Sequence, residues 1–174
     1  MSLPDEAFRL NIHSSPSSHK DELMEIRLDD LSRPEVLRLL HEHLQSAALH
    51  SPPESMHALD VAALRGPDVT FWSAWNGSDL MGCGAVKELD PRHGEVKSMR
   101  TVSAHLRKGV AARMMRHILV EAKHRSYERL SLETGSMDAF APARRLYASF
   151  GFESCGPFSN YVDDPYSLFM TRFV

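Results

Sequence analysis

The sequence of 174 residues has few cysteines, no long apolar run and little net charge. Its two cysteines, Cys83 and Cys155, form no short Cys-x-x-Cys spacing, so we expect reduced structural thiols. No apolar run approaches the roughly 18 to 20 residues that span a bilayer. The N-terminus has no basic region followed by an apolar stretch. We therefore expect a cytoplasmic protein without a membrane partner.

The charge balance and the missing motifs exclude further classes of function. The net charge is -3 and the pI is about 6.4, whereas nucleic-acid-binding modules usually carry a strong basic excess. Neither Gly-x-x-x-x-Gly-Lys-Ser/Thr nor Gly-x-Gly-x-x-Gly occurs, which excludes the usual nucleotide-binding loops. The ten histidines are scattered, and His41 and His43, two residues apart, point to different sides of a helix. We expect no nucleic-acid partner and no metal site.

Composition and length predict one globular domain. Hydrophobic residues make up 43% and charged residues 25% of a chain that is long enough for one continuous core. The Ser/Pro/His-rich segment HSSPSSHK shows no periodic pattern. We expect residues 1–20 to form a loosely packed arm and residues 21–174 to form a single domain.

The first half of the chain predicts strands and one clear amphipathic helix. Residues 24–28 are typical of a short strand, and Pro34 begins a helix to Ala47 with apolar residues on one stripe. A weaker helical stretch covers about 55–65. Two strands flank Asn76-Gly77, a dipeptide typical of a tight hairpin turn. Residues 95–102 add a third strand to this meander.

The second half alternates helices and strands. Residues 109–124 have the clearest helical periodicity, residues 129–134 form a strand, and a helix from 138 ends at Gly151. One or two strands close the chain. The order predicts an α/β (α+β) fold with a mixed, largely antiparallel central sheet flanked by helices.

Four motifs follow one another in residues 95–152: EVKSMRTV, the loop SAHLRKGVAARM at the start of the long helix, RLSLETG and ARRLYASFGF. In this order they resemble the central motifs of the GNAT family of N-acetyltransferases. The family's Gln/Arg-x-x-Gly-x-Gly/Ala pattern is present from Leu106 to Ala111, with leucine at its first position. Phe140 stands where family members often have an asparagine that contacts coenzyme A. The resemblance implies a GNAT fold and an acetyl-CoA-dependent acyltransferase.

The loop has a physical basis for binding acetyl-CoA. A helix N-terminus presents unpaired backbone N–H groups and a positive dipole end, so a strand-loop-helix crossing can bind a pyrophosphate. Side chains at Gly109 and Ala111 would obstruct the approach of phosphate, and Arg107 and Lys108 add positive charge. The cofactor-binding residues that we predict are Thr101, Val102, Arg107, Lys108, Gly109, Val110, Ala111 and Ala112.

The resemblance assigns the acid role to Tyr147, because the tyrosine at this position protonates the departing thiolate in similar enzymes. A phenol titrates near 10 and a thiol near 8.5, so this transfer begins about 2 kcal/mol uphill. We therefore expect a hydrogen-bond donor beside the Tyr147 oxygen that lowers its pKa. The alternative role for Tyr147 is packing in the core.

The acceptor amine needs a base, because an alkylamine is mostly protonated at neutral pH. Glu95 and Glu133 are the candidates; alternatively Glu95 lies in a turn, or Glu133 pairs with Arg100 or Arg129. The acceptor is a small-molecule or peptide amine, and a homodimer is left open. The alternative function is a noncatalytic acyl-CoA-binding or sensor module with the same fold. Residues that we expect near the acceptor are His50, Glu54, His57, Tyr161 and Asp163.

Overall fold

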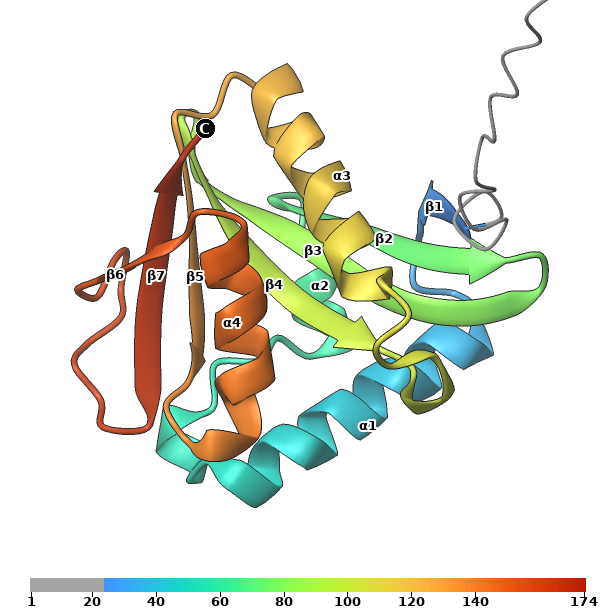
Figure 1. Cartoon of the computed structure of the whole chain (residues 1–174), viewed down its shortest axis with the longest axis horizontal. Helices are drawn as coiled ribbons and strands as arrows, with labels where there is room; N and C mark the ends of the chain where they lie inside the picture. The colour runs from blue at the N-terminus through green and yellow to red at the C-terminus, as the bar shows by residue number, and fades with distance from the viewer. Residues whose placement is uncertain (1–23) are drawn as a thin grey trace, which may run out of the picture.

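The structure, a computed structural model, describes residues 24–174, and the expected arm at residues 1–20 lies outside this range. The described residues form a seven-stranded sheet in the order β1-β2-β3-β4-β5-β7-β6 (Figure 1). The strands are β1 (Met24–Leu28), β2 (Val69–Asn76), β3 (Asp79–Asp90), β4 (His93–Thr101), β5 (Arg129–Gly135), β6 (Glu153–Cys155) and β7 (Ser167–Phe173). The α-helices are α1 (Pro34–His50), α2 (Val61–Leu64), α3 (Val110–His124) and α4 (Ala141–Ser149), and short 3-10 turns cover Pro53–Ser55, Ser103–His105 and Asp138–Phe140.

Strands β2 to β4 form the predicted antiparallel meander, and β1 pairs antiparallel with β2 at its edge. Asn76 pairs with Asp79 across a tight turn in which Gly77 has a φ of 59°, a conformation that glycine adopts without steric cost. Of the strand pairs recorded in residues 24–174, β4 with β5 is the parallel one. The mixed, largely antiparallel sheet is confirmed.

Strands β4 and β5 pair only at their beginnings. Their register covers His93 to Glu95 on β4 and Arg129 to Ser131 on β5. Beyond Glu95 the two strands diverge, as the ribbon shows (Figure 1). A sheet that splits in this way exposes the edges and the backbone of both strands, which creates room for a ligand between them.

The two faces of the sheet are covered by different helices. Helix α3 buries Met114, Met115 and Ile118 in a core that also contains Tyr147 of α4. On the other face α1 packs through buried apolar residues, Val36, Leu39 and Leu40. Both helices were predicted from their apolar periodicity, and the residues that they bury belong to the predicted stripes.

Some element bounds differ from the sequence prediction. The stretch 55–65 is not one helix: Asp60 accepts a hydrogen bond from the Ala63 amide at 2.8 Å, which starts the short helix α2 only at Val61. Helix α1 continues beyond Ala47 to His50, and β4 begins two residues before the expected strand. Two strands, β6 and β7, close the chain.

Candidate active site

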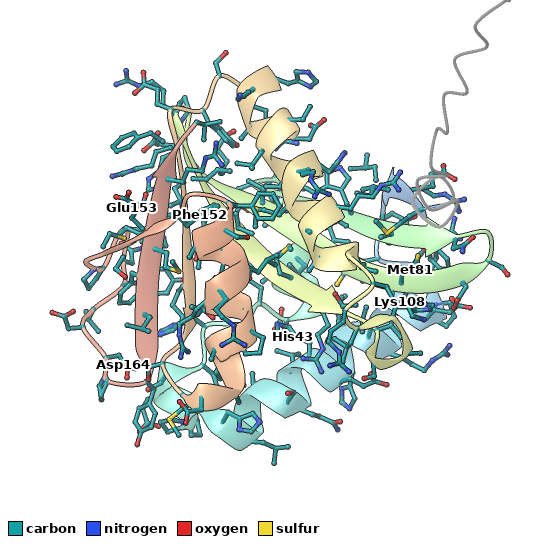
Figure 2. All side chains as sticks on the ribbon, viewed as in Figure 1. His43, Met81, Lys108, Phe152, Glu153 and Asp164 are labelled. Atoms are coloured by element: carbon teal, nitrogen blue, oxygen red, sulfur yellow. The ribbon has the colours of Figure 1, made fainter. Side chains whose placement is uncertain are left out.

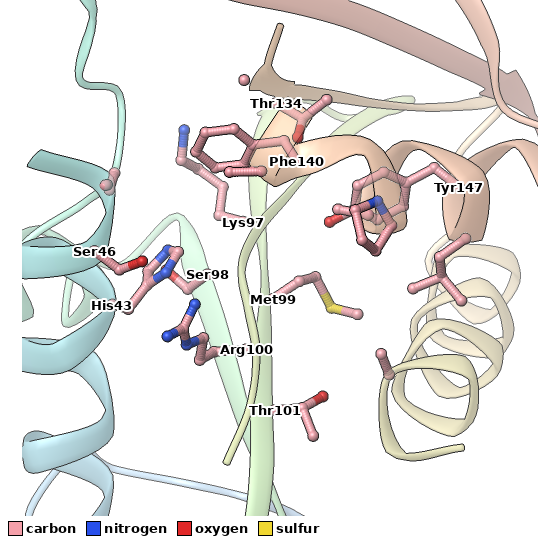
Figure 3. A pocket seen from close by; sticks show the side chains of 18 of the residues that line it. His43, Ser46, Lys97, Ser98, Met99, Arg100, Thr101, Thr134, Phe140 and Tyr147 are labelled. Carbon is pink, nitrogen blue, oxygen red and sulfur yellow. The ribbon is translucent and has the colours of Figure 1, made fainter. Parts of the chain in front are cut away.

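A bulge interrupts β4 beside the split in the sheet. Cys83 of β3 pairs with Arg100 and Ala85 pairs with Lys97, so Ser98 and Met99 lie opposite the single residue between them, Gly84. Ser98 has a φ of 54°, and the Cys83 thiol donates to its carbonyl oxygen at 3.3 Å. The bulge turns Ser98 and Arg100 toward α1, while Met99 and Thr101 point toward α3 and α4 (Figure 3).

A cavity of about 660 Å³ occupies this split. Its walls come from α1, the segment after α1, the bulged half of β4, the loop and first turn of α3, the end of β5, and α4. Cavities of this size are typical of small-molecule sites.

The loop before α3 forms one end of the cavity. Gly109 has a φ of 81°, and a Cβ built there would meet no atom within 4 Å, so the space in front of the helix is open. No described side chain caps the first amides of α3. Leu106, Arg107 and Lys108 are exposed. The helix therefore presents its N–H groups to the cavity together with the charge of Arg107.

Tyr147 and Glu133 line the same cavity from α4 and β5. Tyr147 is buried, and burial, followed by the Glu133 charge, raises its pKa above the ordinary value. Burial also raises the pKa of Glu133, against a hydrogen bond from the Ser167 hydroxyl at 2.8 Å and the nearby charges of His57 and Lys97. At neutral pH the site thus holds a neutral phenol beside a carboxyl with increased basicity.

Glu95 lies outside the lining of the cavity, in a buried polar cluster. Its carboxylate accepts from Lys97 at 2.9 Å and from the Tyr161 hydroxyl at 2.5 Å, and Lys97 also donates to the Tyr161 oxygen at 2.8 Å. Only 3% of Glu95 is exposed, and it is not among the residues that line the cavity. This arrangement suits a role in positioning Lys97 and Tyr161.

Comparison with known proteins identifies the family of the chain. The sequence model of the acetyltransferase (GNAT) family matches residues 21–152. The chain belongs to this family. The N-acetyltransferase YsnE of Bacillus subtilis is 62% identical over 149 residues, which cover 86% of this chain and 99% of the relative. The N-acetyltransferase YedL of Escherichia coli is 51% identical over 146 residues, which cover 84% and 92%.

The solved structures agree with the fold. A GNAT family acetyltransferase from Elizabethkingia anophelis, solved with acetyl-CoA bound, superposes with a TM-score of 0.63 at 14% identity over 88% of this chain and 99% of that one. The expected GNAT fold and the acetyl-CoA-dependent N-acetyltransferase activity are confirmed at the level of the family. Within residues 24–174 of this GNAT protein, no helix is long and apolar enough to cross a membrane. The same residues contain no group of His, Cys, Asp and Glu side chains that could hold a metal ion.

The structure brings most of the predicted site residues of this GNAT protein into one cavity. The lining includes Tyr147, Glu133, Thr101, Arg107, Gly109, Val110, Ala111 and Ala112. Val102 and Lys108 are outside the described lining, as is Glu95. Of the residues expected near the acceptor, His50 and His57 line the cavity, whereas Glu54, Tyr161 and Asp163 do not.

One local expectation was wrong, and two of the alternatives left open by the sequence are excluded. No donor to the Tyr147 oxygen is found in residues 24–174, and its pKa is raised rather than lowered, because burial disfavours the phenolate. Glu133 pairs with neither arginine; it accepts from Ser167. Glu95 lies within β4 and not in a turn, since pairing of this strand with β5 begins at His93.

Phe140 packs where the family's asparagine is often found. Its ring lies directly over Gly135, where a Cβ would collide with it, and meets the His50 ring edge-on at 6.1 Å between centroids. Sequence reasoning missed His43, Ser46, Ser98 and Arg100, which form the α1 side of the cavity. No sequence motif indicates them, because the turn of Ser98 and Arg100 toward α1 comes with a bulge in the pairing of β4 with β3.

Proposed function

We propose that this GNAT protein binds acetyl-CoA between the α3 loop and Tyr147 and transfers the acetyl group to a small-molecule amine that enters from the α1 side. The observation that carries the proposal is the single cavity that joins the N-terminus of α3 to Tyr147 and Glu133. An acyl donor held by the loop and an acceptor held near β5 would meet inside it.

The loop residues suit a pyrophosphate. The first amides of α3 receive no side-chain cap, and the small residues Gly109, Ala111 and Ala112 leave the approach open. Arg107 lines the cavity and adds a guanidinium that can bind two phosphate oxygens through two parallel hydrogen bonds. Thr101 and the bulge at Met99 border the path from this loop to Tyr147, so we assign them to the pantetheine arm.

Glu133 is the base in this proposal. An alkylammonium titrates near 10, so a carboxylate that removes its proton gains from a raised pKa of its own. Burial supplies that rise at Glu133, and the Ser167 hydroxyl fixes the orientation of the carboxylate. The negative charge also attracts the ammonium form of the acceptor into the cavity.

Tyr147 is the acid, and its action is coupled to that of Glu133. The ammonium first loses one proton to solvent by way of Glu133. The nitrogen–carbon bond forms as Glu133 takes the second nitrogen proton, the carbon–sulfur bond then breaks, and sulfur takes the phenolic proton. The Glu133 charge contributes to the raised pKa of Tyr147. Once Glu133 is protonated that contribution is lost, and the phenol becomes a better donor at the stage when a proton is needed. The proton on Glu133 then restores Tyr147.

Release of the coenzyme A thiol tests the proposal across amino acids, polyamines, aminoglycosides and small peptides. We expect turnover with the wild type and a loss of about 100-fold in kcat for Tyr147→Phe, with unchanged affinity for acetyl-CoA. Tyr166→Phe is the matched control, because Tyr166 is partly exposed and lies outside the cavity. Equal rates for both variants would remove Tyr147 from the chemistry. Binding of acetyl-CoA without thiol release from any amine would instead indicate the noncatalytic module.

A further inference from the structure

The α1 side of the cavity contains an arginine without a partner. Among residues 24–174 no carboxylate pairs with the Arg100 guanidinium, and its Nε is buried without a hydrogen bond. Arg100 lines the cavity and points toward α1 (Figure 3). A partly buried cation without a counter-charge is costly, so it indicates a site for an anion that arrives with a ligand.

Uncharged hydrogen-bonding groups surround Arg100. His43 of α1 lies against it, and burial together with the Arg100 charge lowers the pKa of His43 to about 4, which leaves the imidazole neutral at neutral pH. The Ser98 hydroxyl is buried without a partner, and Ser46 of α1 points to the same place (Figure 3). The cluster therefore combines one positive charge with neutral groups that can donate to an anion.

The cluster is separated from the groups that face acetyl-CoA. Ser98 and Arg100 leave β4 toward α1, whereas Met99, Thr101 and Tyr147 lie toward α3 and α4 (Figure 3). The carboxylate of Glu133 is on β5, across the split in the sheet. The cavity thus has an acidic group at one place and a cationic group at another, in addition to the α3 loop.

We propose that the acceptor is an amine that carries a carboxylate, and that Arg100, Ser98 and His43 bind this carboxylate while the amine faces Glu133. The inference rests on the proposed function and names its substrate class. A singly charged carboxylate balances the single charge of Arg100. Its two oxygens lie in one plane, so a guanidinium can bind them through two parallel hydrogen bonds. A doubly charged phosphate would leave excess negative charge in a cavity that already holds Glu133.

Binding of N-acetylated products tests the inference without requiring turnover. The probes are N-acetylglycine, N-acetyl-β-alanine, N-acetyl-γ-aminobutyrate and N-acetylphenylalanine, each paired with its carboxamide, and N-acetylated phosphoethanolamine. Calorimetric titration of these probes into the enzyme saturated with coenzyme A gives the ratio of the two affinities. We expect at least one acid to bind about 10- to 100-fold more tightly than its amide, the range for a hydrogen-bonded charge.

Variants at Arg100 assign the preference to the cluster. Arg100→Met should bring the ratio of acid affinity to amide affinity close to one. Arg100→Lys should retain part of the preference for the acid, and both variants should bind coenzyme A with unchanged affinity. Arg92→Met is the matched control, because Arg92 is exposed in the turn before β4 and pairs with Glu128 at 3.0 Å. Thermal unfolding of each variant shows whether the fold is intact.

Three results would overturn the inference. They are equal affinities for acids and amides in the wild type, a preference for the phosphate probe, and an Arg100→Met variant that loses affinity for coenzyme A instead of for the acids. The proposed function is rejected by different results: a wild type that binds no acetyl-CoA, or one that releases no thiol with any amine.

Discussion

Replacement of Gly109 by alanine tests the part of the proposed acetyl-CoA site that depends on backbone alone. Gly109 has a φ of 81° immediately before α3. A left-handed conformation costs a residue with a Cβ about 1–2 kcal/mol. Since a Cβ at this position meets nothing within 4 Å, no clash adds to that cost. Alanine must either keep the strained conformation or relax and turn the loop amides away from the cavity.

The expected magnitudes separate stability from binding. We expect Gly109→Ala to lower the free energy of unfolding by about 1 kcal/mol in urea denaturation. We expect the affinity for acetyl-CoA to fall by about 10-fold or more in calorimetry, because amide hydrogen bonds to charged phosphate are worth about 1.5–3 kcal/mol each. Both effects come from one methyl group.

Gly77 provides a matched control on the same molecule. It has a φ of 59° in the hairpin turn between β2 and β3, and its Cβ position is equally empty. Gly77→Ala should therefore lose a similar amount of stability while its affinity for acetyl-CoA stays at the wild-type value. If the two variants bind acetyl-CoA equally well, the loop amides do not hold the pyrophosphate and our reasoning about this end of the cavity fails.

Further substitutions test the proposed base, the core, and the contact between Gly135 and Phe140 in the cavity wall. Glu133→Gln should lower kcat by about 100-fold. It should also raise the melting temperature at neutral pH, because burial raises the pKa of Glu133 and makes its ionised form unfavourable in the fold. This gain should vanish as the pH falls below the ordinary carboxyl pKa, where the wild-type carboxyl is protonated in both states; a gain that persists in acid would contradict the assignment. Ile118→Ala should cost about 2–5 kcal/mol in urea denaturation, since Ile118 is 0% exposed, whereas Val120→Ala on the exposed face of α3 should change stability by less than about 0.5 kcal/mol. Gly135→Ala should cost about 1–3 kcal/mol because its Cβ meets the Phe140 ring, and the penalty should shrink in a chain that also carries Phe140→Ala; additive losses would show that the ring is not the obstacle.

The α3 end of the cavity, where we propose that acetyl-CoA binds, was predictable because its parts are contiguous in the chain. Val110, Met114, Ile118 and Ala122 repeat at helical spacing, and all four are buried in α3. Gly109 stands directly before them, so the helix start and its open approach can be found from sequence alone. Two details at this end could not be predicted from the spacing of residues in the sequence. They are the position of Lys108 outside the cavity and the raised pKa of Tyr147, and both depend on how distant segments pack.

The α1 side of the cavity, where we propose that the acceptor binds, could not be predicted, because it depends on the bulge in β4. Strict alternation along this strand would place Val96, Ser98 and Arg100 on one face, in the core under α3. Val96 does lie in that core, but the extra residue at Ser98 moves Met99 to its side and turns Arg100 toward α1.

No residue of β4 marks the bulge in the sequence. The sequence KSMRT contains no glycine, and the contacts made by the bulged residues come from β3 and α3: the Cys83 thiol donates to the Ser98 carbonyl, and Met99 and Met114 both crowd the position of a Cβ at Gly84. One backbone irregularity therefore determines two properties of the enzyme, the path past Met99 toward Tyr147 and the cation that faces α1. A substitution at Gly84 that forces Met99 aside should consequently disturb both acetyl-CoA and acceptor binding, although Gly84 itself is not among the residues that line the cavity.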